Sequence, residues 1–527
     1  MNNSYKIWLV ILSVVLTGLF FGNAGRAIDK IQESRVAETA REMVVSGDWV
    51  IPHYNGELRL QKPPLPYWLT AVSYKVFGVN EGAVRIPSAI FAVMLAILVF
   101  IWAKQETDIN IATNIVLVLM TSFISLRYFR SGEADTTLLF FITMACYAGY
   151  HLVRSISISN ETSGIVTSKR YALLLMVALG LGFLTKGPAA IAIPLLSVLI
   201  FAYLQYGAKH CLSTLKRLIN PVGIIIFIIT ASAWYVWILT TMPEIAAHFL
   251  GKQVDETFVS GTHQQPIYWY LQHAIDFFAP WSLLLIPTGI WCYKHRPLPT
   301  MIHFSVIWLA VVFVLLTFTV NKQTQYALLF APPIAMMIGY YLKQTQIKSI
   351  ANAKFYQFNR VIFWLLCAAI IVGLIVAAPK HVLVDFNPVY WILMLIIPLL
   401  ANKLLKLSTL STPILLAAVL ATTGYLFAEQ YITKEANKSD IKMLMQTAAN
   451  KHELYNKLAL YQSKPGDGAV SFYASRPIKT VDEKQLAELL KVEPQLWLIS
   501  KEKPELPNAQ LAEEHTQGKW TLWKVSR

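Results

Sequence analysis

Apolar residues occur along this chain in long blocks that are separated by short polar segments. Most blocks are about 17 to 25 residues long, which is the length that an α-helix needs to cross the ~30 Å hydrocarbon core of a bilayer. We therefore predict an all-α polytopic membrane protein with about 13 transmembrane helices. The predicted spans are 7–24, 84–103, 109–127, 133–153, 170–186, 188–206, 219–241, 276–293, 301–319, 325–342, 360–378, 388–402 and 408–427.

The composition and charge agree with this pattern. Charged residues make up only 14% of the chain, whereas an ordinary soluble domain has roughly 25%. The net charge of +15 does not indicate nucleic-acid binding, because many basic residues fall in short loops between spans, and such loops stay in the cytoplasm. The loops with Lys209, Lys216 and Lys294 therefore predict that segments 25–83 and 428–527 lie outside.

The first external segment, 25–83, is polar but rich in aromatic residues and prolines. Residues 29–45 contain neither Gly nor Pro, and several of their apolar positions share one helix face, which predicts an amphipathic helix on the outer membrane surface. The tract Lys62-Pro63-Pro64 cannot continue a helix. A second element should therefore begin near Tyr67.

The end of the chain has the composition of a soluble domain. Helical patterns at 438–452 and 482–491 alternate with the strand-like runs LALY, VSFYA, LWLIS and TLWKV. We therefore predict two domains, a transmembrane domain at 1–427 and a small α/β domain at 428–527.

Ionisable residues gather where the first external segment meets the membrane. Asp29 and Glu33 are one helical turn apart and would share a face. Lys62 stands directly before two prolines, where a merely solvated lysine has no evident use. Asp135 precedes the apolar run TTLLFF, and a charge at that depth usually faces a polar cavity. For the glutamates of the first segment, a solvated helix face is the alternative.

Three further residues carry weaker signals. Lys186, in the segment LTKGP, suits either a bound phosphate or a polar turn. Arg130 lies in RYFRSGEAD at the external junction of two spans, and His263 is a lone loop histidine of the kind that is more often structural. The cations suit the binding of a phosphate-bearing lipid, and one of the carboxylates could accept a proton.

Four segments of the chain resemble a known family. They are QESRVAETAREMVVSGDWVIPHYNGELRLQKPPLPYWLTAVSYKVFG, RYFRSGEADTTLLFF, LGFLTKGPAAIAIP and THQQPIYWYLQHAIDFFAPWS. They are similar, in the same order, to the signatures of the bacterial 4-amino-4-deoxy-L-arabinose transferases and of the wider protein-mannosyltransferase-like glycosyltransferases with the GT-C fold. The resemblance covers roughly residues 5–345, and the string GDW…KPPL…YW is its most specific part.

The resemblance implies a sugar transferase that uses a polyprenyl-phosphate donor on the periplasmic face of the bacterial inner membrane. It places Arg59 and Lys62 near the donor phosphate, Lys186 as a second cation there, and Asp135 at the family's second acidic position. The expected partners are the polyprenyl-linked sugar, membrane lipids and an envelope acceptor, which is lipid A, another glycan or a protein. No cofactor is required, although a divalent metal is compatible with such a site. Further candidates for substrate binding are Arg35, Arg130 and His263.

One position departs from the family pattern. The family commonly has Asp-Glu before x-Arg, with the Asp regarded as catalytic, whereas residues 32–35 of this chain read QESR. A glutamine cannot accept a proton. Either Glu33 or Asp29 takes this role, or this branch uses an acceptor that needs less base assistance, or the protein is inactive. We expect Glu33, the direct neighbour, to act with Asp135.

A transporter or lipid flippase is the alternative function, because many spans with a few charges also suit a substrate pathway. That function predicts broken helices at the membrane midplane and inverted repeats. The sequence shows no such repeat, and its charges cluster towards one face.

Overall fold

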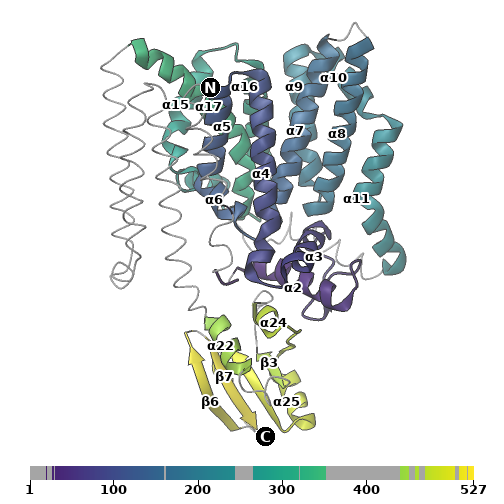
Figure 1. Cartoon of the computed structure of the whole chain (residues 1–527), viewed down its shortest axis with the longest axis vertical. Helices are drawn as coiled ribbons and strands as arrows, with labels where there is room; N and C mark the ends of the chain where they lie inside the picture. Colours follow the sequence, from purple (N-terminus) through teal and green to yellow (C-terminus); the bar gives the residue numbers. More distant parts are fainter. Residues whose placement is uncertain are drawn as a thin grey trace.

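The computed structural model describes residues 19, 26–28, 30–158, 162–243, 265–319, 321–351, 440–449, 457–461, 469–504, 510–518 and 520–526. Figure 1 shows a bundle of helices with a small sheet beneath one end. Within the described residues, six helices are long and apolar enough to cross a membrane. They are α4 (Glu81–Glu106), α7 (Asp135–Ile158), α8 (Thr162–Lys186), α9 (Ala189–Tyr206), α11 (Pro221–Thr241) and α16 (Thr300–Phe318).

Each of these six helices coincides with a predicted span, so the prediction of a polytopic helical membrane protein with a small C-terminal α/β region is confirmed. The count of about 13 spans stays a prediction. The predicted spans 360–378, 388–402 and 408–427, with most of 7–24, lie outside the described residues.

Three predicted spans are interrupted. The span predicted at 109–127 consists of α5 (Ile109–Thr121) and α6 (Phe123–Phe129), which meet at an angle of 67°. The bend lies at Ser122, whose backbone is extended, and the next amide, that of Phe123, donates to the Ala279 carbonyl instead of to its own helix. The other two spans break beside prolines. The span predicted at 276–293 consists of α14 (Ala274–Phe278), η1 (Trp281–Leu284) and α15 (Leu285–Lys294). The span predicted at 325–342 consists of η2 (Thr324–Phe330) and α17 (Ala331–Ala351).

The helix α7 is the best buried of the membrane-crossing helices. It packs against α4, α8 and α9, and small residues allow close approach. A Cβ added at Gly149 would lie 2.2 Å from Val198, for example. The amphipathic helix α10 (Ala208–Leu218) joins α9 to α11 at the end of the bundle away from the sheet (Figure 1).

The first external segment forms a compact layer across the lower ends of α4, α8 and α11 (Figure 1). It contains α2 (Ile31–Ser46), the hairpin β1 (His53–Tyr54) and β2 (Glu57–Leu58), and α3 (Leu65–Phe77), which begins after the double proline as predicted. The helix α2 was also predicted, but it does not lie on the surface with a solvated charged face. Glu38, Arg41 and Glu42 are all buried, because the layer is covered from both sides.

The C-terminal region is a five-stranded sheet with helices. The strand order is β4-β3-β5-β7-β6, where β3 is parallel to β4 and β5, and β7 is antiparallel to β5 and β6. The run VSFYA was predicted as a strand but forms the helix α24, because parallel β3 and β4 need a crossover connection. The elements are α22 (Asp440–Ala449), β3 (Leu458–Tyr461), α24 (Ala469–Ala474), β4 (Thr480–Val481), α25 (Glu483–Val492), β5 (Gln495–Ser500), β6 (Gln510–Gln517) and β7 (Trp520–Ser526).

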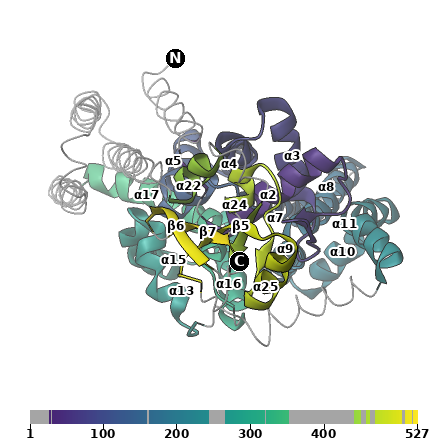
Figure 2. The ribbon, with the colours of Figure 1, turned by 90° about the horizontal axis from the view of Figure 1, so that it is seen from below.

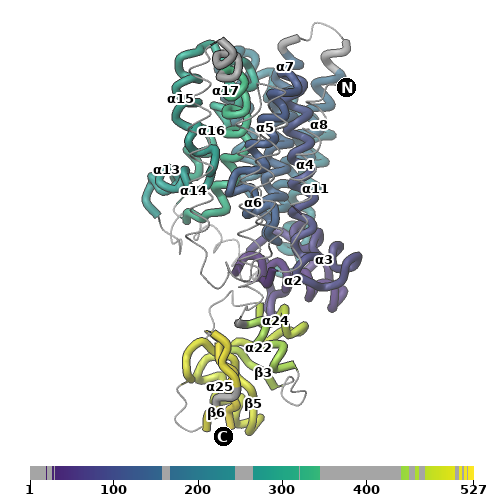
Figure 3. The backbone as a smooth tube through the Cα atoms, turned by 60° about the vertical axis from the view of Figure 1, so that its left-hand side comes forward, coloured from purple at the N-terminus to yellow at the C-terminus, as the bar shows by residue number. Residues whose placement is uncertain are grey.

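The C-terminal sheet lies directly beneath the layer of α2 and α3, as the side view in Figure 3 and the view from below in Figure 2 show. Polar contacts join the two. Arg41 donates to the carbonyl of Ser475 over 2.9 Å, and the Tyr473 hydroxyl accepts a 2.8 Å hydrogen bond from the amide of Ile28. Lys442 and Glu81 form an ion pair at 2.6 Å.

Candidate active site

A cavity lies where the first external layer meets the ends of α7 and α8. Its polar wall comes from four parts of the chain that are far apart in the sequence. Gln32 comes from α2, Arg59 and Lys62 come from the segment between β2 and α3, and Thr185 and Lys186 come from the end of α8. The turn before α7 contributes Glu133, and its first residue contributes Asp135.

The cations of this cavity are fixed by their surroundings. Arg59 is only 8% exposed, its Nε donates to the Tyr67 hydroxyl at 3.0 Å, and its guanidinium lies 5.4 Å from the centre of the Tyr54 ring. Lys62 lies in the same wall. The rigid double proline that follows Lys62 explains why a lysine here is held at the cavity.

Lys186 and Asp135 form an ion pair in the wall of the cavity. Lys186 Nζ lies 2.6 Å from Asp135 Oδ1 and 5.2 Å from the centre of the Tyr326 ring. Lys186 is the last residue of α8, and the next residue, Gly187, has a φ of +92° that ends the helix. Asp135 is the first residue of α7. The two apolar helices therefore present these charges at their ends, as the sequence pattern suggested.

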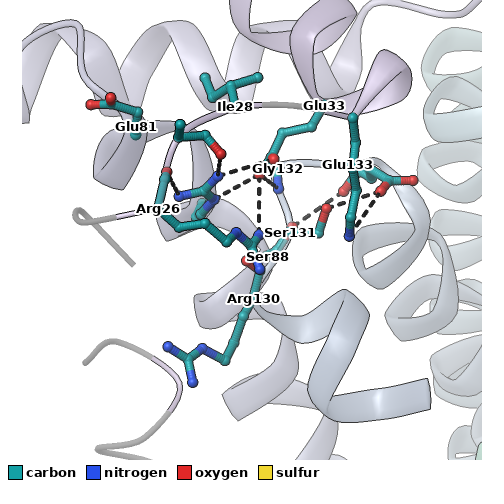
Figure 4. A network of polar contacts seen from close by, with 12 residues as sticks. Arg26, Ile28, Glu33, Glu81, Ser88, Arg130, Ser131, Gly132 and Glu133 are labelled. Atoms are coloured by element: carbon teal, nitrogen blue, oxygen red, sulfur yellow. Dashed lines mark hydrogen bonds and ion pairs between the residues drawn. The ribbon is translucent and has the colours of Figure 1, made fainter. Parts of the chain in front are cut away.

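Glu33 belongs to a buried network of polar contacts with Arg85, Arg26 and Gly132. Its carboxylate accepts two hydrogen bonds from Arg85, at 2.7 and 3.0 Å, and one from the amide of Gly132 at 2.8 Å. Arg26 lies 3.7 Å away. Figure 4 shows the Glu33 side chain directed at Arg26 and Gly132. Burial alone would raise its pKa, but Arg85 and Arg26 overcome this and lower the pKa to about 2.

Glu33 is therefore a structural carboxylate in this arrangement. It is not among the residues that line the described cavity, and its oxygens are already engaged by three donors. The role of Glu33 as the substitute for the missing family aspartate stays a prediction, and the geometry of α2 separates its side chain from that of Gln32. Consecutive residues of an α-helix point about 100° apart, so a neighbour of Gln32 does not reach the same space.

Glu133 is the carboxylate that sequence reasoning did not select. It is 7% exposed, accepts a hydrogen bond from the Ser131 hydroxyl at 3.0 Å, and has Lys30 at 3.9 Å. Burial, followed by the negative charge of Asp135, raises the pKa of Glu133 above its ordinary value. The available signal was its position two residues before Asp135 in the SGEAD turn.

The remaining sequence candidates are distributed as follows. Arg130 is buried, and its carbonyl accepts a hydrogen bond from Arg26 at 3.1 Å. Arg35 is half-buried on α2. Neither is among the residues that line the cavity. Asp29 and His263 lie outside the described residues. Arg85 was missed, although an arginine at the start of an apolar span needs a buried partner.

Within the described residues, no group of three or more His, Cys, Asp or Glu side chains is placed so that it could hold a metal ion.

Known proteins match this chain in sequence. Residues 61–237 match the dolichyl-phosphate-mannose-protein mannosyltransferase family. A protein of Aquifex aeolicus, named only as uncharacterized, is 28% identical over 352 residues, which are 66% of this chain and 66% of that protein. The undecaprenyl phosphate-alpha-4-amino-4-deoxy-L-arabinose arabinosyl transferase of Serratia proteamaculans is 25% identical over 377 residues, which are 70% of this chain and 65% of that enzyme. The matched part thus spans just under two thirds of these relatives.

Solved structures match over nearly the whole chain. ArnT from Cupriavidus metallidurans bound to undecaprenyl phosphate has a TM-score of 0.78 at 19% sequence identity, covering 99% of this chain and 98% of that one. The apo state of the same protein has a TM-score of 0.77. The family match and the named relatives support the resemblance to the 4-amino-4-deoxy-L-arabinose transferases in sequence, and the ArnT structures show the same fold. The shared fold and the apolar helices agree with a multi-pass membrane protein.

Proposed function

We propose that this protein is an integral membrane glycosyltransferase that moves a sugar from a polyprenyl-phosphate donor to an envelope acceptor. The observation that carries the proposal is the cavity itself. Three cations, Arg59, Lys62 and Lys186, share one cavity with the carboxylates Glu133 and Asp135 at the end of a membrane-crossing bundle. Transfer from a lipid phosphate needs both kinds of group at the level of the lipid headgroups.

The three cations are the proposed binding site for the donor phosphate. Breaking the bond between the sugar and the phosphate leaves negative charge on the phosphate, and fixed cations in a site of low polarity stabilise that charge strongly. The relatives named as undecaprenyl phosphate-alpha-4-amino-4-deoxy-L-arabinose arabinosyl transferases support undecaprenyl phosphate as the carrier. The sugar centre then has oxocarbenium character, as in glycoside hydrolysis.

We further propose that the cavity faces the periplasm. Basic residues such as Lys209, Lys216 and Lys294 lie on α10 and at the end of α15, at the end of the bundle opposite the sheet (Figure 1). The positive-inside rule assigns that end to the cytoplasm. In this arrangement, a transmembrane domain at 1–427 carries the first periplasmic loop at 25–83, and 428–527 forms a periplasmic α/β domain.

The acceptor is proposed to be lipid A, another glycan or a protein of the envelope. A transporter or flippase is the less favoured alternative, because such a protein needs a polar path near the middle of the bundle. The charged cavity lies at the ends of α7 and α8 instead.

Two measurements test the function. Mass spectrometry of lipid A and envelope glycans from cells with and without the gene should reveal a sugar that depends on the protein. In proteoliposomes, the purified protein should transfer sugar from undecaprenyl phosphate-4-amino-4-deoxy-L-arabinose to lipid A, with other undecaprenyl-phosphate sugars tested in parallel. A protein that binds undecaprenyl phosphate but transfers none of these sugars, in cells or in proteoliposomes, would contradict the proposal.

The donor site has its own test. Lys62→Ala and Lys186→Ala should each weaken binding of undecaprenyl phosphate by roughly 10- to 150-fold, since a hydrogen bond to a charged group contributes about 1.5 to 3 kcal/mol. Lys75→Ala is the matched control, because Lys75 is exposed on α3 and does not line the cavity. Unchanged affinity in both cavity variants would give these lysines structural roles.

A further inference from the structure

The proposed transferase needs a group that takes the proton from the acceptor hydroxyl. We propose that this general base is Glu133, a side chain in the turn before α7. The inference rests on the proposed function and adds to it the residue that activates the acceptor. It depends on comparing the carboxylates near the cavity, which differ in orientation and in the partners that already hold them.

Glu33 is excluded by its contacts. Both of its oxygens accept hydrogen bonds from Arg85, and one of them also accepts from the Gly132 amide. A carboxylate held in this way is stabilised in its ionised form and would bind a proton only weakly. Gln32, its neighbour on α2, does line the cavity, but an amide side chain cannot accept the proton in its place.

Asp135 lines the cavity but is paired directly with a cation. Its Oδ1 lies 2.6 Å from Lys186 Nζ, so the ion pair holds the negative charge that a base would use. This contact also fixes the position of the Lys186 ammonium group at the cavity. Asp135 is therefore better suited to position the cation that binds the donor than to accept a proton.

Glu133 combines the features that the other two carboxylates lack. It lines the same cavity as Gln32, Lys62 and Lys186, and its contact with Lys30, at 3.9 Å, is longer than a hydrogen bond. The Ser131 hydroxyl donates to one oxygen at 3.0 Å. Figure 4 shows this side chain directed away from the Arg26 and Glu33 network.

The turn that carries Glu133 is rigid, as a base needs. The Ser88 hydroxyl donates to the Glu133 carbonyl at 3.2 Å, and the Gly132 amide is tied to Glu33 at 2.8 Å. A Cβ added at Gly132 would lie 2.1 Å from Val84, so the turn packs tightly against α4. In this way the structural carboxylate, Glu33, positions the peptide next to the proposed base.

The electrostatic surroundings favour proton uptake. Glu133 is buried, and the charged groups that act on it are Asp135 and Glu33, which are negative, and Lys30 and Lys186, which are positive. Burial and the nearby Asp135 keep its pKa above the ordinary glutamate range. A base with a pKa nearer to neutrality is more effective in proton transfer than one of ordinary acidity.

The proposed step is a direct transfer of the sugar from the phosphate to the acceptor. The acceptor oxygen forms a bond to the anomeric carbon of the sugar while the bond between that carbon and the phosphate oxygen breaks. The electron pair of the broken bond stays on the phosphate, beside Arg59, Lys62 and Lys186. The acceptor proton passes to a Glu133 oxygen and is then released to solvent. The products are the glycosylated acceptor and polyprenyl phosphate.

The test compares Glu133→Gln with the wild-type protein in proteoliposomes. The substrates are the undecaprenyl-phosphate sugar and the acceptor between which the wild-type protein transfers sugar. The glutamine keeps the size of the side chain and an oxygen for Ser131. Binding of undecaprenyl phosphate should stay within about twofold, whereas kcat should fall by about 100- to 10,000-fold, the usual contribution of a positioned base. A second variant, Glu133→Gln with Gln32→Asp, places a new carboxylate on the same cavity and should recover part of the lost turnover.

The outcomes separate this inference from the proposed function. The role of Glu133 would be overturned if Glu133→Gln had wild-type turnover. It would also be overturned if the loss of turnover only matched a loss of folded protein in a thermal-unfolding assay. Neither outcome would contradict the proposed transferase function. A complete absence of transfer by the wild-type protein would overturn both. For the wild-type protein, kcat/KM should fall in acid with an apparent pKa above the ordinary carboxyl range. If the double variant Glu133→Gln with Gln32→Asp recovers turnover but shows the same apparent pKa as the wild-type protein, the assignment of Glu133 is contradicted.

Discussion

Replacing Glu33 with glutamine tests whether this residue stabilises the fold or performs catalysis. The carboxylate is fully buried and held by Arg85, Arg26 and the Gly132 amide. Its pKa of about 2, compared with an ordinary 4.5, corresponds to about 3 kcal/mol of favourable interaction with the ionised form. Removal of one partner from a buried ion pair typically costs about 3 to 5 kcal/mol. We therefore expect Glu33→Gln to lose about 3 kcal/mol of stability.

The dependence of this effect on pH follows from the sign of the pKa shift. Because the folded-state pKa lies below the unfolded one, Glu33 contributes its full stabilisation above about pH 5 and loses it as the pH falls towards 2. The difference between the wild-type protein and Glu33→Gln should thus be largest at neutral pH and shrink in acid. Thermal unfolding in detergent or nanodiscs measures it, with an expected drop of a few degrees at neutral pH.

Two controls sharpen the result. Glu57→Gln makes the same chemical change at an exposed position of β2 and should leave the unfolding temperature almost unchanged. The double variant Glu33→Gln with Arg85→Gln should cost less than the sum of the single changes, because each single change leaves a buried partner uncompensated. Normal stability of Glu33→Gln together with a large loss of turnover would refute this reasoning and return Glu33 to the role of base.

Three further predictions concern the contacts around the site. Gly132→Ala should reduce stability by about 1 to 3 kcal/mol, measured by thermal unfolding, because its Cβ would lie 2.1 Å from Val84. Tyr473→Phe should increase hydrogen exchange in α24 and near Ile28, because it leaves the Ile28 amide, which is bonded at 2.8 Å, without its acceptor. Burial and neighbouring Glu38 raise the pKa of Glu42 to about 7, so ionised Glu42 destabilises the fold above that pH. Glu42→Gln should unfold at a higher temperature than the wild-type protein at pH 8, and this difference should shrink as the pH falls below about 7 and vanish below the ordinary pKa of 4.5.

The membrane-crossing helices could be predicted from the sequence because the length and apolarity of a span are local properties. The predicted spans at 133–153 and 301–319 agree with α7 and α16 to within a few residues at most ends. Interruptions were harder to predict, since they depend on tertiary contacts. The bend at Ser122, for instance, is accompanied by a hydrogen bond from Phe123 to Ala279, which is distant in the sequence.

Part of the candidate site was also predictable. Lys62, Lys186 and Asp135 were selected because a charge beside a proline tract or at the end of an apolar span needs a polar environment, and all three line one cavity. The surroundings of Glu33 were harder to predict, because adjacency to Gln32 in the sequence does not bring its side chain to the same cavity. Its actual partner, Arg85, lies 52 residues away, and no local pattern links the two residues.

The external layer connects the C-terminal sheet to the proposed site. Arg41 makes two hydrogen bonds to Glu38, at 2.8 and 2.7 Å, and a third to the carbonyl of Ser475 after α24. The helix α2, which carries Arg41 and Glu38, also carries Gln32 at the cavity and Glu33 in the network that holds Gly132. The contact with Ser475, the cavity and the Gly132 network therefore lie along one continuous helix. The C-terminal region contacts α2 from below while the bundle contacts it from above, which gives this region a physical reason to be part of the proposed enzyme.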